Sequence, residues 1–200
     1  MDGGRFFPRR VFDESFSERL QIGILRCVLA GWYEGTRSVR LRFDYFSAHD
    51  LLGHERRAYI EQNLRAFAKR HKINCPKAKL NYARNSFHTE LVSGRTVLTA
   101  SALEWQDQMV REALFRNTMA REPQAHLFDE EIPPDSNDPL YGIICYGVGA
   151  RRVDPIPGFV RVAFPNSTCS NYIDAVDLMG KYPTATNKLI LRLRRGEGIA

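Results

Sequence analysis

Hydrophobic and polar residues alternate over residues 38–46, where Val39, Leu41, Phe43 and Tyr45 share one side of an extended chain. Alternation with a period of two is typical of a half-buried strand. Over residues 56–71 the apolar positions recur every three or four residues instead, which predicts an amphipathic helix. The chain from 38 to 71 is therefore expected to form a strand, a turn and a helix.

The residues that follow predict a second strand, a hairpin and a second helix. Residues 73–82 form an extended segment interrupted by Pro76, and a strand on each side of a helix implies a parallel pair with a right-handed crossover. The segments 87–92 and 95–100 flank Ser93-Gly94, which is a two-residue hairpin signal. Ser101 and Glu104 have capping-box spacing, which predicts a helix to about residue 117. The order β-α-β-β-β-α over 38–117 predicts an α/β fold with a mixed sheet, as in a minimal thioredoxin-like domain.

An N-terminal helix is expected at residues 14–30. Its apolar positions are Phe16, Leu20, Ile24, Cys27 and Val28. Gly31 stands where a C-terminal cap glycine is expected. The preceding arm, residues 1–11, is rich in arginine and is either a frayed terminus or a segment that becomes ordered on a partner.

The composition changes after residue 121. Acidic residues and prolines crowd the stretch to 138, which predicts a linker. Beyond it, residues 141–148 and 158–164 resemble short strands, 171–179 a short helix, and 188–195 alternates again. The predicted organisation is an arm and helix at 1–34, a thioredoxin-like domain at 35–120, a linker at 121–140 and an irregular C-terminal extension at 141–200.

Charge and cysteine content limit the classes of function. The 200 residues carry a net charge of +6, which favours an anionic partner such as nucleic acid, an acidic protein or an anionic membrane surface. No apolar run approaches the roughly 18 residues of a membrane span, so no membrane insertion is expected. The N-terminus lacks the apolar segment of a secretory signal, and the four widely spaced cysteines are expected to be free thiols.

No catalytic motif is present in the sequence. The loop 47–55, before the predicted helix, lacks the cysteine that thioredoxin-type redox chemistry needs at a helix N-terminus. His49 and His54 have no third ligand at a recognised spacing, so no metal site is expected. A P-loop, a dinucleotide fingerprint and a nucleophile elbow are also absent. We therefore expect no enzyme activity, no cofactor and no small-molecule substrate.

Basic residues mixed with aromatic and amide side chains are the remaining functional signal. Such residues on the outside of a helix are often only a solvated surface, but together with the basic arm they predict contact with RNA phosphates. The candidate RNA-binding residues are Arg5, Arg9, Arg10, Arg56, Arg57, Arg65, Lys69, Arg70, Lys77 and Lys79.

The segment 59–70 (YIEQNLRAFAKR), the Ser93-Gly94 hairpin and the later Arg116-Asn117 pair resemble a thioredoxin-like family. That family is shared by certain mitochondrial ribosomal proteins and a small accessory subunit of respiratory complex I. The arm and residues 49–57 are similar to the small-subunit member of the S-twenty-five type, whereas the helix is closer to large-subunit member forty-three. The former's cysteine cluster and the latter's Gly-Gly-Ser-Ser turn are absent here.

The resemblance implies a structural constituent of the mitochondrial ribosome, located in the matrix, that binds rRNA and neighbouring ribosomal proteins. The alternative is an accessory scaffold subunit of complex I, with protein contacts and no RNA. The complex I subunit is shorter, and the basic arm and the long tail of this chain argue against it.

Overall fold

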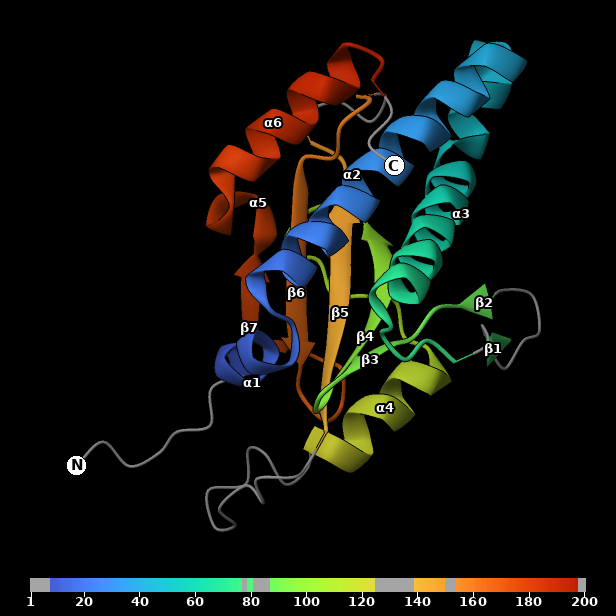
Figure 1. Cartoon of the computed structure of the whole chain (residues 1–200). Coiled ribbons are helices and arrows are strands. Elements are labelled where there is room, and N and C mark those ends of the chain that lie inside the picture. The colour runs from blue at the N-terminus through green and yellow to red at the C-terminus, as the bar shows by residue number, and fades with distance from the viewer. Residues whose placement is uncertain (1–7, 77–78, 81–86, 125–138, 150–153, 198–200) are drawn as a thin grey trace.

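The fold is a five-stranded mixed sheet covered by helices on both faces (Figure 1). The structure is a computed structural model, and it describes residues 8–76, 79–80, 87–124, 139–149 and 154–197. The strands are β3 (Leu91–Ser93), β4 (Thr96–Leu103), β5 (Leu140–Gly147), β6 (Phe159–Pro165) and β7 (Tyr172–Asp177), and they lie in that order. The prediction of an α/β protein with a mixed sheet is confirmed.

Among the strands that the structure describes, one neighbouring pair is parallel. β4 and β5 run in parallel, with Thr96 opposite Leu140 and Leu103 opposite Gly147, whereas the other neighbours are antiparallel. The crossover between β4 and β5 contains α4 (Leu114–Gln124). The predicted β3–β4 hairpin forms, but its two-residue turn is Gly94-Arg95 and not Ser93-Gly94, because Ser93 still pairs with Thr96. Gly94 has a φ of 52°, a conformation that favours glycine.

Two long antiparallel helices form a hairpin over one face of the sheet. α2 (Glu18–Arg42) has 25 residues and α3 (Tyr45–His71) has 27, and a two-residue turn joins them. The Asp44 carboxylate accepts hydrogen bonds from the backbone N–H groups of Phe46 and Ser47, which caps the N-terminus of α3. The helix predicted at 56–71 is therefore confirmed as the second part of a longer helix.

The strand predicted at residues 38–46 is wrong, because this stretch contains the end of α2, the turn and the start of α3. Of its alternating apolar residues only Val39 is buried, while Leu41, Phe43 and Tyr45 are exposed. The parallel strand–helix–strand unit is therefore not formed. Within residues 73–82 the only described strand is β1 (Lys79–Leu80), which pairs antiparallel with β2 (Phe87–His88). The thioredoxin-like order of elements is thus not confirmed.

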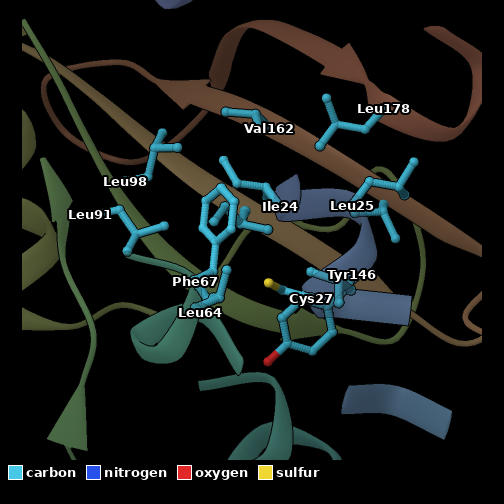
Figure 2. Packing of buried hydrophobic residues seen from close by; sticks show 14 of the residues in the cluster. Ile24, Leu25, Cys27, Leu64, Phe67, Leu91, Leu98, Tyr146, Val162 and Leu178 are labelled. Atoms are coloured by element: carbon cyan, nitrogen blue, oxygen red, sulfur yellow. The ribbon is translucent and has the colours of Figure 1, made fainter. Parts of the chain in front are cut away.

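The main core lies between the helical hairpin and the sheet (Figure 2). Ile24 and Leu25 of α2 and Leu64 and Phe67 of α3 pack toward Leu91, Leu98, Tyr146 and Val162 of the sheet and Leu178 after it. On the other face a smaller cluster forms beneath α4, built from Tyr141, Ile143, Cys145, Phe159 and Ala163. Because β5 and β6 are covered on both faces, every residue of both strands is buried.

The C-terminal segment belongs to the same sheet and core as the hairpin. After β7 the chain forms α5 (Leu178–Lys181) and α6 (Pro183–Arg194), which packs against α2. Helix α1 (Pro8–Ser15) packs beside β7, where Arg9 forms a 2.8 Å ion pair with Asp174. Lys181 likewise forms a 2.6 Å ion pair with Asp13. Helix α1 therefore contacts the C-terminal part of the chain, at Asp174 and Lys181, along the β7 edge of the sheet.

Four further predictions of local structure are wrong. The capping-box helix is absent because β4 continues through Ser101 to Leu103, where it pairs with β5. Residues 172–177 form strand β7 instead of a helix, and 188–194 belong to helix α6 instead of an alternating segment. The C-terminal part is therefore regular, and the two strands predicted at 141–148 and 158–164 are confirmed as β5 and β6.

The fourth wrong prediction is the cap at Gly31, which lies inside α2. Regarding the predicted domains, β4 and β5 join the 35–120 segment and the 141–200 segment in one sheet. Most of the predicted linker, residues 125–138, lies outside the described residues.

Candidate nucleic-acid interface

A solvent-facing groove of about 900 Å³ runs between the first half of α2 and the last turns of α3. Small residues allow the two helices to lie close together there, since Gly23 of α2 faces the ring of Phe67 in α3. Cys27, Ala30, Ala66 and Phe67 line the groove with apolar surface. The groove is therefore shaped by helix packing within the hairpin.

Arginine and histidine side chains border this groove from both helices. Arg19 and Arg26 come from α2, and Arg70 and His71 come from α3. Two carboxylates, Glu18 and Glu34, are also present, and Glu34 accepts a 3.4 Å hydrogen bond from the Asn63 amide. Residues 19 and 26 are two helical turns apart and so lie on the same face of α2.

The exposed face of α3 extends this charge beyond the groove. Arg65, Lys69, Arg70 and Lys72 are exposed, and residues 62–72 contain no acidic side chain. Arg19, Lys69 and Arg70 form no ion pair with any other described residue. We call the set Arg19, Arg26, Arg65, Lys69, Arg70 and Lys72 the basic stripe.

Part of this charge also stabilises the protein itself. Cations in the last turn of a helix interact favourably with its dipole, and Lys69, Arg70 and His71 occupy the last turn of α3. Arg65 donates a 3.0 Å hydrogen bond to Thr89 and lies 3.7 Å from the Glu61 carboxylate. Lys69, Arg70 and Arg19 are therefore the members of the basic stripe that are best placed to meet an external anion.

Three of the predicted RNA-binding residues, Arg65, Lys69 and Arg70, lie together in the basic stripe. Arg56 is instead 3% exposed, and its Nη2 donates to the backbone carbonyl of Asp154 at 2.9 Å. Arg57 is half-buried and donates to the carbonyl of Phe87 at 2.8 Å. Contact between Arg56 and a phosphate would require the segment at Asp154 to move away.

The remaining predicted residues are not part of the stripe. Arg9 and Arg10 lie in α1, which packs beside β7, the edge of the sheet opposite β3. Both are engaged there, Arg9 by Asp174 and Arg10 by Glu14 at 2.9 Å. Lys79 lies in the short strand β1, and Arg5 and Lys77 lie outside the described residues.

Sequence reasoning missed Arg19 and Arg26. The signal was their seven-residue spacing, which places both on one side of a helix if the helix begins near residue 18. Nothing in the sequence showed that this side lies against the end of α3. That relationship follows only if residues 38–46 are recognised as the connection between two antiparallel helices. The groove therefore became visible only with the hairpin.

Two buried thiols, Cys27 beside the groove and Cys145 on the other face of the sheet, are poorly suited to covalent chemistry. Burial raises the pKa of the Cys27 thiol to about 12, although the charges of Arg26 and Arg70 act in the opposite direction. Cys145, under α4, is fully buried, and its pKa is raised to about 11. A thiol with a raised pKa is mostly protonated at neutral pH and is a weak nucleophile. Among the described residues no group of three or more His, Cys, Asp or Glu side chains is arranged to hold a metal ion.

Comparison with family models, curated proteins and solved structures finds no match to this chain. In the described part of the chain, none of the helices combines the length and the apolar character that a membrane span requires.

Proposed function

We propose that this protein is a non-enzymatic RNA-binding scaffold whose basic stripe contacts the phosphate backbone. The observation that carries the proposal is that Arg19 of α2 and Arg70 of α3 flank one groove and the exposed Lys69 is next to Arg70 in α3. None of the three has an ion-pair partner among the described residues. The net charge of +6 supports the same partner class. Cations of this kind bind RNA by displacing its condensed counterions.

The packing of the hairpin supports a scaffold role. Each helix of the pair is close to 40 Å long, and both are fixed to the sheet through a continuous core. Cations carried on such helices keep their mutual spacing when a partner binds, so less ordering is required than for cations on loops.

The resemblance of residues 59–70 and the β3–β4 hairpin to mitochondrial ribosomal proteins extends this proposal to the mitochondrial ribosome. The partners would then be rRNA and neighbouring ribosomal proteins, and the location would be the matrix. This extension, together with the thioredoxin-like relationship, rests on the resemblance alone. A complex I scaffold remains the second candidate and predicts no RNA contact.

RNA binding is tested by fluorescence anisotropy with labelled single-stranded RNA over a series of salt concentrations. The triple variant Arg19→Gln, Lys69→Gln, Arg70→Gln should bind more weakly, and the slope of log K against log salt should fall by about 2, since each phosphate contact on a single strand contributes about 0.7. The matched control removes three charges from α6 and its C-terminal end, through Lys188→Gln, Arg194→Gln and Arg195→Gln. An unchanged slope in the first variant, or no RNA binding by the wild-type protein, would overturn the proposal.

Sucrose-gradient sedimentation of solubilised mitochondria tests the extension to the mitochondrial ribosome. Co-migration with one ribosomal subunit supports it and identifies the subunit. Migration with complex I, with ribosomal fractions empty, favours the scaffold alternative.

A further inference from the structure

The turn between α2 and α3 carries a cluster of exposed large apolar side chains. Leu41 is 75% exposed, Phe43 40%, Tyr45 71% and Phe46 79%. These four residues, which we call the hairpin tip, lie within six consecutive positions at the end of the hairpin away from α1 (Figure 1). Contiguous exposed apolar surface of this kind marks an interaction site more often than isolated exposed residues do.

The hairpin does not need these side chains in order to close. Beneath the tip, Val39 of α2 packs with Ala48 and Leu52 of α3 in a separate small cluster. The turn is fixed by Asp44, whose carboxylate caps α3, and by a 2.8 Å ion pair between Arg42 and Glu55. The exposed residues of the hairpin tip are therefore left available for a partner.

A hollow of about 330 Å³ lies beside the exposed residues. Its lining is Arg40, Phe43, Tyr45, Ala48, His49 and Leu52. Tyr45 contributes to this lining, and the Phe46 ring stands 5.6 Å from the Tyr45 ring, edge to face. The same end of the molecule thus presents projecting aromatic side chains and a recess with apolar walls.

We propose that the hairpin tip is a self-association surface, in which two copies of this chain meet tip to tip around a two-fold axis. In a two-fold interface one patch must be complementary to itself, so it needs both a projection and a recess. Phe46 and Tyr45 of one copy would enter the hollow of the other, and the reverse contact would form by symmetry.

The charges around the tip favour a second copy over an anionic partner. Arg40 and Arg42 are interspersed with Asp44 and Asp50, so the surface carries both signs. Asp44 lies between the exposed aromatic residues and would approach the phosphates of a bilayer or of RNA, which is unfavourable. Because these four charges cancel, the surface carries little net charge and does not repel a second copy.

The area available implies a weak dimer. A large aromatic side chain buries roughly 150–250 Å² when fully covered. Four partly exposed residues on each copy then give a total on the order of 1,000 Å², the lower end of the range for specific interfaces. The fraction of the protein that is dimeric should therefore rise with protein concentration and fall on dilution.

Sedimentation velocity of the full chain over low micromolar to submillimolar concentrations tests the proposal. The weight-average mass should rise from 23.0 kDa toward twice that value. The double variant Tyr45→Ser, Phe46→Ser should remain at the monomer mass at every concentration. Trp105→Ser is the matched control, since Trp105 is 58% exposed but lies outside the hairpin, and it should associate like the wild type.

A cysteine substitution adds a geometric test. Phe46→Cys should form an intermolecular disulfide under mild oxidation faster than Trp105→Cys, because residue 46 lies within the proposed interface and residue 105 lies outside it. A wild-type protein that stays monomeric throughout, equal cross-linking rates, or concentration-dependent association that persists in the tip variant would overturn the proposal. Binding of the monomer through the tip to vesicles containing phosphatidylserine would also overturn it in favour of a membrane contact. RNA binding is read by a separate assay, so the two proposals can fail independently.

Discussion

The guanidinium of Arg56 lies 3.9 Å from the centroid of the Trp32 ring, and both side chains donate a hydrogen bond to the backbone carbonyl of Asp154. Arg56 Nε also donates to Thr36 Oγ1 at 2.9 Å. This contact joins α2, α3 and the segment that leads into β6. The cation is buried, and its hydrogen bonds and the ring offset the loss of its hydration.

Replacing Arg56 should destabilise the fold substantially. Arg56→Ala removes hydrogen bonds from a charged donor and opens space beside Trp32, so we expect a loss of about 2–4 kcal/mol in the free energy of unfolding. Arg56→Lys should recover only part of this loss, because an ammonium group lacks the planar fork. The measurement is urea unfolding followed by circular dichroism. Arg70→Ala, on the exposed face of the same helix, should change stability by about 0.5 kcal/mol or less. Equal effects at both positions would contradict the assigned role of Arg56.

Two glycines of the hairpin should respond oppositely to alanine. A Cβ at Gly31 would lie 2.6 Å from the backbone nitrogen of Ile60, so Gly31→Ala should force the helices apart and cost about 1–3 kcal/mol. At Gly53 the added carbon meets no atom within 4 Å other than its chain neighbours and the nearby backbone of α3, so Gly53→Ala should stabilise α3 by up to about 1 kcal/mol. Thermal unfolding of both variants provides the comparison. Stabilisation by Gly31→Ala would show that the helices are further apart than described.

The carboxyl of Glu61 should make stability depend on pH. Burial raises its pKa above the ordinary value of 4.5, while the nearby Thr89 and the charges of Arg57 and Arg65 act in the opposite direction. The folded state therefore holds this proton more tightly than the unfolded chain, so this contribution to stability falls as pH rises from 4.5 through the raised pKa.

Glu61→Gln cannot ionise, so its stability relative to wild type should improve as pH rises through that window and level off above it. Urea unfolding between pH 4 and pH 8 (a range of about four units around the titration) measures the difference. Glu104→Gln on the surface is the control. A difference between Glu61→Gln and wild type that does not vary with pH would contradict the raised pKa.

The four cysteines should differ in how fast their thiols react with an alkylating reagent. Cys75 is half-buried, whereas Cys27, Cys145 and Cys169 are buried. Burial raises the pKa of all four thiols, and for Cys27 the value reaches about 12. We expect iodoacetamide to alkylate Cys75 first in the native protein, and all four cysteines in denaturant, as read by peptide mass spectrometry. Preferential alkylation of Cys27 or Cys145 in the folded state would contradict this and would reopen a catalytic role for that thiol.

Local turn chemistry and central strands were predictable, but alternation alone was not a reliable sign of a strand. The hairpin turn was predicted to within one residue, because the positive φ at Gly94 favours glycine independently of the rest of the fold. Residues 38–46 alternate for a different reason: Val39 closes the hairpin, while Leu41 and Tyr45 remain exposed. In α6, Leu189 and Leu193 are buried at helical spacing, and Leu191 faces solvent. An alternating segment of nine or fewer residues is therefore compatible with a strand or with part of a helix, and only a neighbouring strand that pairs with it decides between them.

The basic candidate residues were predictable as a class, but their grouping was not. Arg65, Lys69 and Arg70 are close in sequence, and the helix alone places them together. The burial of Arg56 depends on Trp32 and Asp154, which are distant in sequence. The contribution of Arg19 depends on how α2 crosses α3. Such relationships arise from tertiary packing and leave no local pattern.

The packing of the N-terminal helices against the C-terminal half of the chain affects the order in which this protein folds during its synthesis. Helices α2 and α3 are complete by residue 71, but the strands that cover their apolar faces include β5 and β6, which end at residue 165. The contacts of α1 with Asp174 and Lys181 require still later residues. A nascent chain must therefore carry two exposed amphipathic helices until most of it has left the translating ribosome, a period in which a chaperone or an early partner would protect it from aggregation.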